Sequence, residues 1–138
     1  MKIHTTNYFE TFIEVAEDCP TENGQIPPSK SDKKSIAEMQ YERIQSHPYT
    51  FTSDDVLFDV FAERKDLTAS EYEAAKQEFF CKGQACFRAS PLTKCYGFGV
   101  HANSEGKIAI FGKETEEYAA FLNNPSVTKV KAMRSSKK

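Results

Sequence analysis

Residues 79–112 read FFCKGQACFRASPLTKCYGFGVHANSEGKIAIFG, and this stretch decides the fold class. It holds three of the four cysteines and five of the six glycines of the chain. Short apolar runs between turn-forming residues predict three successive strands, at about 84–89, 95–102 and 107–112. We therefore expect an antiparallel β-meander in this part of the chain.

Three helices are expected before the meander, between about residues 35 and 83. Ser35 is followed three residues later by Glu38, and Thr68 by Glu71. Both pairs match the capping box that opens a helix. Thr52 stands in the N-cap position of the helix between them. The helices therefore form a continuous run on the N-terminal side of the strands.

Residues 8–16, YFETFIEVA, fit two structural periods. Phe9, Phe12 and Ile13 follow one face of a helix, whereas Phe9, Ile13 and Val15 follow the alternation of a strand. Aromatic and β-branched residues favour the strand. We predict a strand here, and a helix is the alternative.

The remaining elements complete an α+β pattern. Thr115 is placed to cap a helix that ends near Asn123, and residues 127–133 predict a closing strand. The expected order is β-ααα-βββ-α-β. Because helices and strands are grouped, we expect an α+β fold. Its antiparallel β-meander and closing strand would be packed by three N-terminal helices and one later helix.

The length of 138 residues predicts one domain, over residues 1–138. In residues 20–34, Gly, Pro-Pro, Ser and Lys interrupt every period and predict a flexible loop, and residues 134–138 predict a basic tail. No apolar run reaches about 18 residues, so we expect no membrane contact. The N-terminus lacks the apolar region of a signal peptide, which indicates a cytoplasmic protein with reduced cysteines.

Charge is distributed unevenly along the chain. Residues 1–80 carry 8 Lys and Arg against 16 Asp and Glu, whereas residues 81–138 carry 10 against 4. The two halves can complement each other within one fold. A basic face for an anion or a nucleic acid is the alternative. The net charge of −2 argues for no particular partner, and we do not expect nucleic acid as the main one.

Two further motifs fail the spacing that their chemistry requires. Cys81 and Cys86 have no second cysteine pair to complete a structural zinc site. Gly97 and Gly99 lack the third glycine and the following helix of a dinucleotide site. The sequence therefore predicts neither a metal nor a cofactor.

The segment from Arg88 to His101 contains the candidate binding residues. Ser90 precedes a proline and can cap one helical turn, whose free N–H groups suit an anion. Arg88 and Lys94 flank this turn and can hold a carboxylate or phosphate. Tyr96 offers a stacking face, and His101 can donate or accept a proton. In the alternative interpretation the turn caps itself, and the basic residues pair with the acidic half.

Gly97 and Gly99 fall on the same face of the predicted strand at 95–102. Glycines in a strand mark a bulge or a close approach by another group. A helix packed on the bare backbone explains this pattern, and a ligand lying there beside His101 is the alternative.

Several stretches together resemble a known family. They read HTTNYFETFIEVAEDCP, TSDDVLFDVFAER, KGQACFRASPLTKCYGFGVH, EGKIAIFG and KAMRSSKK. They are similar to a family of small, mainly bacterial proteins known as a domain of unknown function. The resemblance runs from His4 to Lys138 and implies no reaction, cofactor or partner.

Three functional hypotheses follow. The first is a binding or interaction module with an anion-compatible site beside the strands at 84–89 and 95–102, for a small anionic molecule or a protein segment. The second is an enzyme with Cys86 or Cys95 as nucleophile and His101 as base, so catalysis stays open. The third is weak nucleic-acid binding through the basic half. A homodimer through an edge strand is also open.

Overall fold

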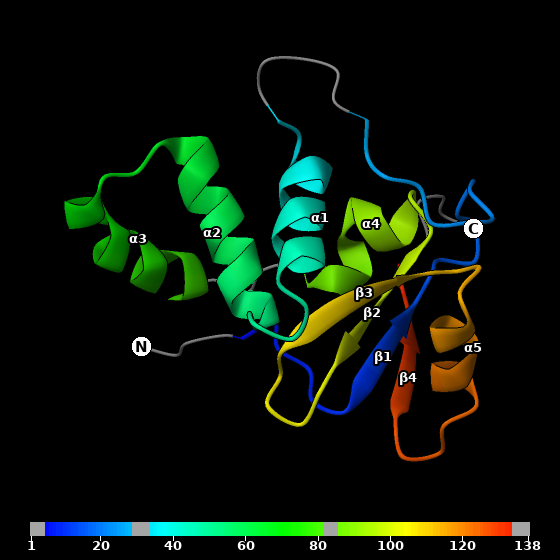
Figure 1. The fold of residues 1–138 in the computed structure, drawn as a ribbon. Helices are drawn as coiled ribbons and strands as arrows, with labels where there is room; N and C mark the ends of the chain where they lie inside the picture. Colours follow the sequence, from blue (N-terminus) through cyan, green and yellow to red (C-terminus); the bar gives the residue numbers. More distant parts are fainter. Residues whose placement is uncertain (1–4, 29–33, 82–85, 134–138) are drawn as a thin grey trace.

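The computed structural model describes residues 5–28, 34–81 and 86–133. Within them one sheet has the strand order β3-β2-β1-β4 (Figure 1). Its strands are β1 (Thr11–Glu14), β2 (Phe98–Ala102), β3 (Ile108–Gly112) and β4 (Thr128–Lys131). The pairs β1–β2 and β2–β3 are antiparallel, whereas β4 runs parallel to β1. The sheet is therefore mixed.

Helices cover both faces of this sheet (Figure 1). They are α1 (Ile36–Ser46), α2 (Ser53–Lys65), α3 (Ala69–Cys81), the 3-10 helix η1 (Phe87–Ala89), α4 (Pro91–Lys94) and α5 (Glu116–Leu122). Helices α1, α2 and α4 lie on one side of the sheet and α5 lies on the other. The hairpin of α2 and α3 extends away from the sheet beyond α1. None of the described helices is long and apolar enough to cross a membrane.

The α+β class is confirmed, but the strand predicted at 84–89 is wrong. Residues 84 and 85 lie outside the described part, and Phe87–Ala89 form η1. The carbonyl of Phe87 accepts hydrogen bonds from Ser90 N (3.3 Å) and from Thr93 Oγ1 (2.6 Å). Because these bonds are local, that carbonyl is not available to a strand ladder.

The expectation of a purely antiparallel sheet is also wrong. The closing strand forms, as β4, but Thr128 N donates to Glu10 O and Ala132 N donates to Glu14 O, both at 2.9 Å. Helix α5 lies between β3 and β4 in the chain, on the far face of the sheet (Figure 1). It carries the chain past β2 to the free side of β1, where β4 runs in the same direction as β1.

Strand β1 is confirmed at residues 11–14, and the helical alternative is wrong. Ile13 packs with Val100 in the core under α1, α2 and α4, whereas Phe12 packs with Tyr118 of α5. The Phe12 and Tyr118 rings meet edge to face, with centroids 4.9 Å apart. Because both faces of β1 are buried, apolar side chains stand at the consecutive positions Phe12 and Ile13 as well as on the alternating set.

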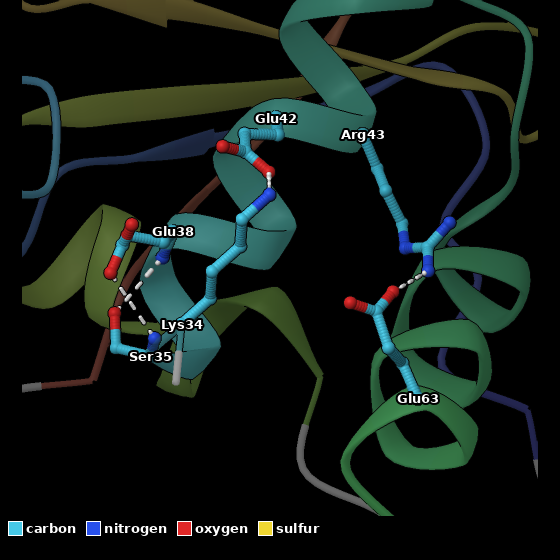
Figure 2. Close-up of polar contacts among 6 residues, drawn as sticks. All are labelled: Lys34, Ser35, Glu38, Glu42, Arg43 and Glu63. Carbon is cyan, nitrogen blue, oxygen red and sulfur yellow. Dashed lines mark hydrogen bonds and ion pairs between the residues drawn. The ribbon is translucent and has the colours of Figure 1, made fainter. Parts of the chain in front are cut away.

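The predicted helix starts are confirmed at α1, α2, α4 and α5. In α1, Ser35 Oγ accepts from Glu38 N at 3.2 Å, and the Glu38 carboxylate accepts from Ser35 N at 3.3 Å. Figure 2 shows this capping box beside an ion pair from Arg43 of α1 to Glu63 of α2, 2.6 Å long. The capping box sets where α1 begins, and the partly exposed ion pair contributes little to stability.

The segment 20–28 follows the surface without regular structure. Gln25 N donates to Tyr96 O at 2.8 Å, and Gly24 N donates to Glu114 Oε1 at 2.7 Å. These bonds hold the segment against the start of β2 and the turn after β3. Residues 29–33 of the predicted flexible loop, and the whole predicted basic tail at 134–138, lie outside the described residues.

Candidate functional site

A cavity of about 440 Å³ lies between the helical hairpin and the rest of the fold. Its walls come from α1, α2, the end of α3, η1 and the start of α4. Seven of the twelve lining residues have hydrocarbon side chains: Ile36, Leu57, Val60, Phe61, Phe79, Ala89 and Pro91. The other five are Gln40, Arg64, Lys65, Cys86 and Ser90. Ligand sites commonly have this size and this mainly apolar lining.

A buried polar pair forms part of the cavity wall. Ser90 Oγ donates a 2.6 Å hydrogen bond to Gln40 Oε1 and accepts one of 3.1 Å from Leu92 N. Ser90 and Gln40 are only 4% and 3% exposed. In the described part of the chain, Gln40 Nε2 donates to no acceptor. Among the described residues Arg43 Nε is the only buried side-chain N or O atom without a partner, so Gln40 Nε2 is reachable by solvent. Its N–H is suited to a ligand that carries an acceptor.

Two cations stand at the rim of the cavity, at the C-terminal end of α2. Arg64 and Lys65 are both exposed lining residues. Lys65 Nζ lies 5.9 Å from the centroid of the Phe61 ring, and an Arg64 guanidinium nitrogen donates to Lys34 O over 3.4 Å. Among the residues that the structure describes, neither cation pairs with a carboxylate.

Cys86, at the start of η1, also lines the cavity. Its thiol lies 3.5 Å from the hydroxyl of Tyr8, which comes from the segment before β1. Burial raises the pKa of Tyr8, the contact with Cys86 adds to this rise, and the nearby Arg88 opposes it. The phenol therefore stays protonated and can donate to the thiol sulfur.

The five predicted binding residues do not converge. Ser90 lines the cavity, but its side chain already caps α4 and bonds Gln40. Arg88 Nε donates to Lys131 O at 2.7 Å, and Arg88 O accepts from Met133 N at 2.7 Å. Arg88 therefore joins η1 to the end of β4.

Lys94 and Tyr96 lie away from the cavity as well. Lys94 ends α4, and Tyr96 packs against the main core while its carbonyl accepts from the segment 20–28. Neither side chain lines the cavity beside Ser90.

His101 belongs to the other face of the sheet. Its Nδ1 lies 2.8 Å from the hydroxyl of Tyr49 in a hydrogen bond, and its ring stacks on Phe121 with centroids 4.2 Å apart. Burial lowers the pKa of His101 below its ordinary value, and Glu10 partly opposes this. Cys86 is on the side of α1 and α2, so the sheet separates this thiol from the imidazole.

The backbone at Gly99 is covered by side chains. A Cβ added there would collide with the Phe12 ring and lie 2.8 Å from Tyr118 Cε2. Gly97 precedes β2 with φ of +76°, and a Cβ there would approach Asn23 O. Packing from α5 and β1 therefore explains the glycine on the strand, and no room for a ligand remains above it.

Sequence reasoning missed Gln40, Arg64 and Lys65 as site residues. The sequence of α2 could have indicated the cavity. Its apolar residues cover a wider part of the helix surface than the contact with the main core buries. Val60 is buried in the main core, whereas Leu57 and Phe61 stay partly exposed at the cavity. No group of three or more His, Cys, Asp or Glu that could hold a metal gathers among the described residues.

The chain matches the model of a protein family. The model of a family described as a family of unknown function (DUF6157) matches residues 3–138. No curated protein and no solved structure matches the chain significantly.

Proposed function

We propose that this chain, a member of the family of unknown function DUF6157, is a binding module that takes one small molecule into the cavity between α2 and η1. The observation that carries the proposal is the combination of a mainly apolar cavity of about 440 Å³ with the spare N–H of Gln40 on its wall. The proposed site includes Ser90, as the sequence predicted. It lies on the α2 side of the Ser90 turn and not beside β2.

The apolar walls supply the driving force for binding. Phe61, Phe79, Leu57 and Pro91 present hydrocarbon surface to the cavity from three separate segments. A ligand that covers this surface gains about 25 cal/mol for each Å² of apolar area removed from water. Because α2, α3 and η1 each contribute a wall, such a ligand would contact the hairpin and the rest of the fold at once.

The buried amide supplies selectivity. Ser90 holds Gln40 Oε1 at 2.6 Å, which fixes the orientation of the carboxamide. With that orientation, Nε2 is the group left to donate to a ligand. A ligand with an acceptor at this point is favoured over one without it, because desolvating an unpaired amide costs about 1–3 kcal/mol.

A cytoplasmic location is part of this proposal. None of the four cysteines, all of which lie in the described part of the chain, forms a disulfide. Thiols are the usual state of cysteine in a reducing compartment.

Binding is tested with a neutral fluorescent probe, N-phenyl-1-naphthylamine, whose emission rises in an apolar site. We expect the wild-type chain to enhance its emission in a saturable manner. Ala89→Phe, which fills the cavity from η1, should reduce the enhancement strongly. Ala120→Phe is the matched control, because Ala120 is exposed on α5 and does not line the cavity.

Circular dichroism and a thermal melt of each variant show whether it folds. Ala89→Leu fills less of the cavity and serves in place of Ala89→Phe if that variant melts far below wild type. Saturable binding that both filling variants leave unchanged would place the probe elsewhere and contradict the proposal.

A further inference from the structure

We infer that the ligand of this cavity is an amphipathic carboxylate, with its apolar body inside and its carboxylate at Arg64 and Lys65. This inference rests on the proposed function and adds the chemical class of the ligand. The inference is based on the positive charge of Arg64 and Lys65 at the rim of the cavity. Both cations are exposed lining residues at the last turn of α2.

Two carboxylates of α1 and α2 already have partners. Glu63 pairs with Arg43 at 2.6 Å, and Glu42 pairs with Lys34 at 2.6 Å (Figure 2). Arg64 and Lys65 have no such partner in the described part of the chain. The C-terminal end of the α2 dipole favours both cations, and because neither pairs with a carboxylate of the described residues, their charge also favours an anion at the mouth of the cavity.

The two cations also have a defined relation to the apolar walls. Lys65 Nζ lies over the ring of Phe61, and Phe61 itself lines the cavity. The stems of Lys and Arg can cover apolar surface while their charged ends stay in water. A ligand that enters along Phe61 would thus have its polar end at the Lys65 ammonium and the Arg64 guanidinium.

The arrangement favours a carboxylate over a neutral or cationic head group. A guanidinium can bind both carboxylate oxygens through two parallel hydrogen bonds. A neutral alcohol gains no charge-assisted bond, and an amine is repelled by both residues. The order of affinity expected for one chain length is therefore carboxylate, then alcohol, then amine.

The experiment compares decanoate, decanol and decylamine as competitors of bound N-phenyl-1-naphthylamine, below their micelle concentrations. We expect decanoate to displace the probe at about one-tenth of the concentration that decanol requires, the order given by two partly exposed ion pairs. Raising the salt concentration should reduce this advantage. Decyl phosphate as a fourth competitor tests whether the preference is for carboxylate: displacement tighter than decanoate would overturn that choice.

The variant is the double substitution Arg64→Gln with Lys65→Gln, and the control is Lys94→Gln with Lys113→Gln. Both remove two positive charges, but Lys94 and Lys113 do not line the cavity. We expect the first double variant to lose the preference for decanoate over decanol, with each competitor measured against that variant's own affinity for the probe. The control should keep it.

The outcomes separate this inference from the function on which it rests. Saturable probe binding with equal displacement by decanoate and decanol contradicts the carboxylate alone. If the Arg64 and Lys65 double variant still prefers decanoate to decanol, that result also contradicts the carboxylate and not the binding function. No binding of the probe or of any competitor contradicts both the function and the ligand class.

Discussion

The hydroxyl of Ser90 donates a 2.6 Å hydrogen bond to the side-chain carbonyl of Gln40, which is 50 positions earlier in the chain. The bond joins the first turn of α4 to the middle of α1 inside the fold. It also orients the amide on the cavity wall. Ser90 thus has a structural role of its own and a second role through Gln40.

Ser90→Ala should destabilise the protein by about 2–4 kcal/mol, because it removes the cap of α4 and leaves Gln40 Oε1 buried without its donor. The free energy of unfolding, measured by urea denaturation, checks this. Ser104→Ala, at an exposed position in the turn between β2 and β3, should change it by less than about 0.5 kcal/mol. A loss at Ser90 no larger than that control would mean that the bond to Gln40 contributes nothing in solution.

Asp54→Asn should release the N-terminal segment from α2. The Asp54 carboxylate accepts from Thr5 Oγ1 (2.6 Å), Thr6 N (2.7 Å) and Thr6 Oγ1 (2.6 Å). Hydrogen bonds to a charged group are the stronger kind, so we expect a loss of about 1–3 kcal/mol and faster amide exchange in residues 5–8. Hydrogen exchange and denaturation measure the two effects.

Asp66→Asn is the control at the other end of the same helix. Asp66 ends α2 with φ of 54°, a conformation that Asn tolerates, and its side chain is exposed. We expect it to leave stability within about 0.5 kcal/mol of wild type. If both variants lose the same amount, the bonds from Thr5 and Thr6 are not the cause.

Gly99→Ala should cost about 1–3 kcal/mol, because the new methyl group would overpack the space held by Phe12 and Tyr118. Gly112→Ala is the control on β3, where the nearest atoms to the new methyl group belong to the Glu114 carboxylate. Moving that carboxylate would cost at most its exposed bond from Gly24 N, so the loss of stability in Gly112→Ala should be smaller. Thermal melts of both variants give the comparison, and an equal loss would contradict the close packing of α5 on β2.

His101 should make stability depend on pH. Burial lowers its pKa from the ordinary value of 6.5, so the unfolded chain binds a proton at a pH where the folded chain does not. The free energy of unfolding should therefore fall as pH falls below about 7, and should level off once the folded state is also protonated. Urea denaturation across this range measures the change.

In His101→Gln, the free energy of unfolding should no longer fall in this pH range. The control His47→Gln, which replaces an exposed histidine, should show the same fall as wild type. The two profiles are compared after subtraction of the wild-type curve. If His47→Gln flattens the profile and His101→Gln does not, the imidazole between Tyr49 and Phe121 is not the group that titrates.

The local signals of the sequence predicted most of the elements. The capping residues Ser35, Thr52, Ser90 and Thr115 each begin a helix at the expected position. Such signals act between residues that are two or three positions apart, so they do not depend on the rest of the fold. The strand expected at 84–89 does not form. Phe87 is of a residue type that favours strands, but its carbonyl accepts local hydrogen bonds from Ser90 and Thr93.

The site could not be predicted in the same way. Gln40, Arg64 and Cys86 come together only because α1, α2 and η1 pack against one another. In the sequence they are separate residues with ordinary neighbours. Arg88 and His101 looked like site residues because they flank glycines and a Ser-Pro turn, but the fold uses Arg88 to hold β4 and packs His101 on α5.

The sequence by itself determined the α+β class, the ends of most helices and the strand at residues 11–14. These depend on capping side chains, turn residues and the spacing of apolar residues, which are local. Only the tertiary structure decided that β4 lies parallel to β1, that Phe12 and Tyr118 cover Gly99, and that a cavity opens beside Ser90. These depend on contacts between residues tens of positions apart, whose energies are set by how whole elements pack together.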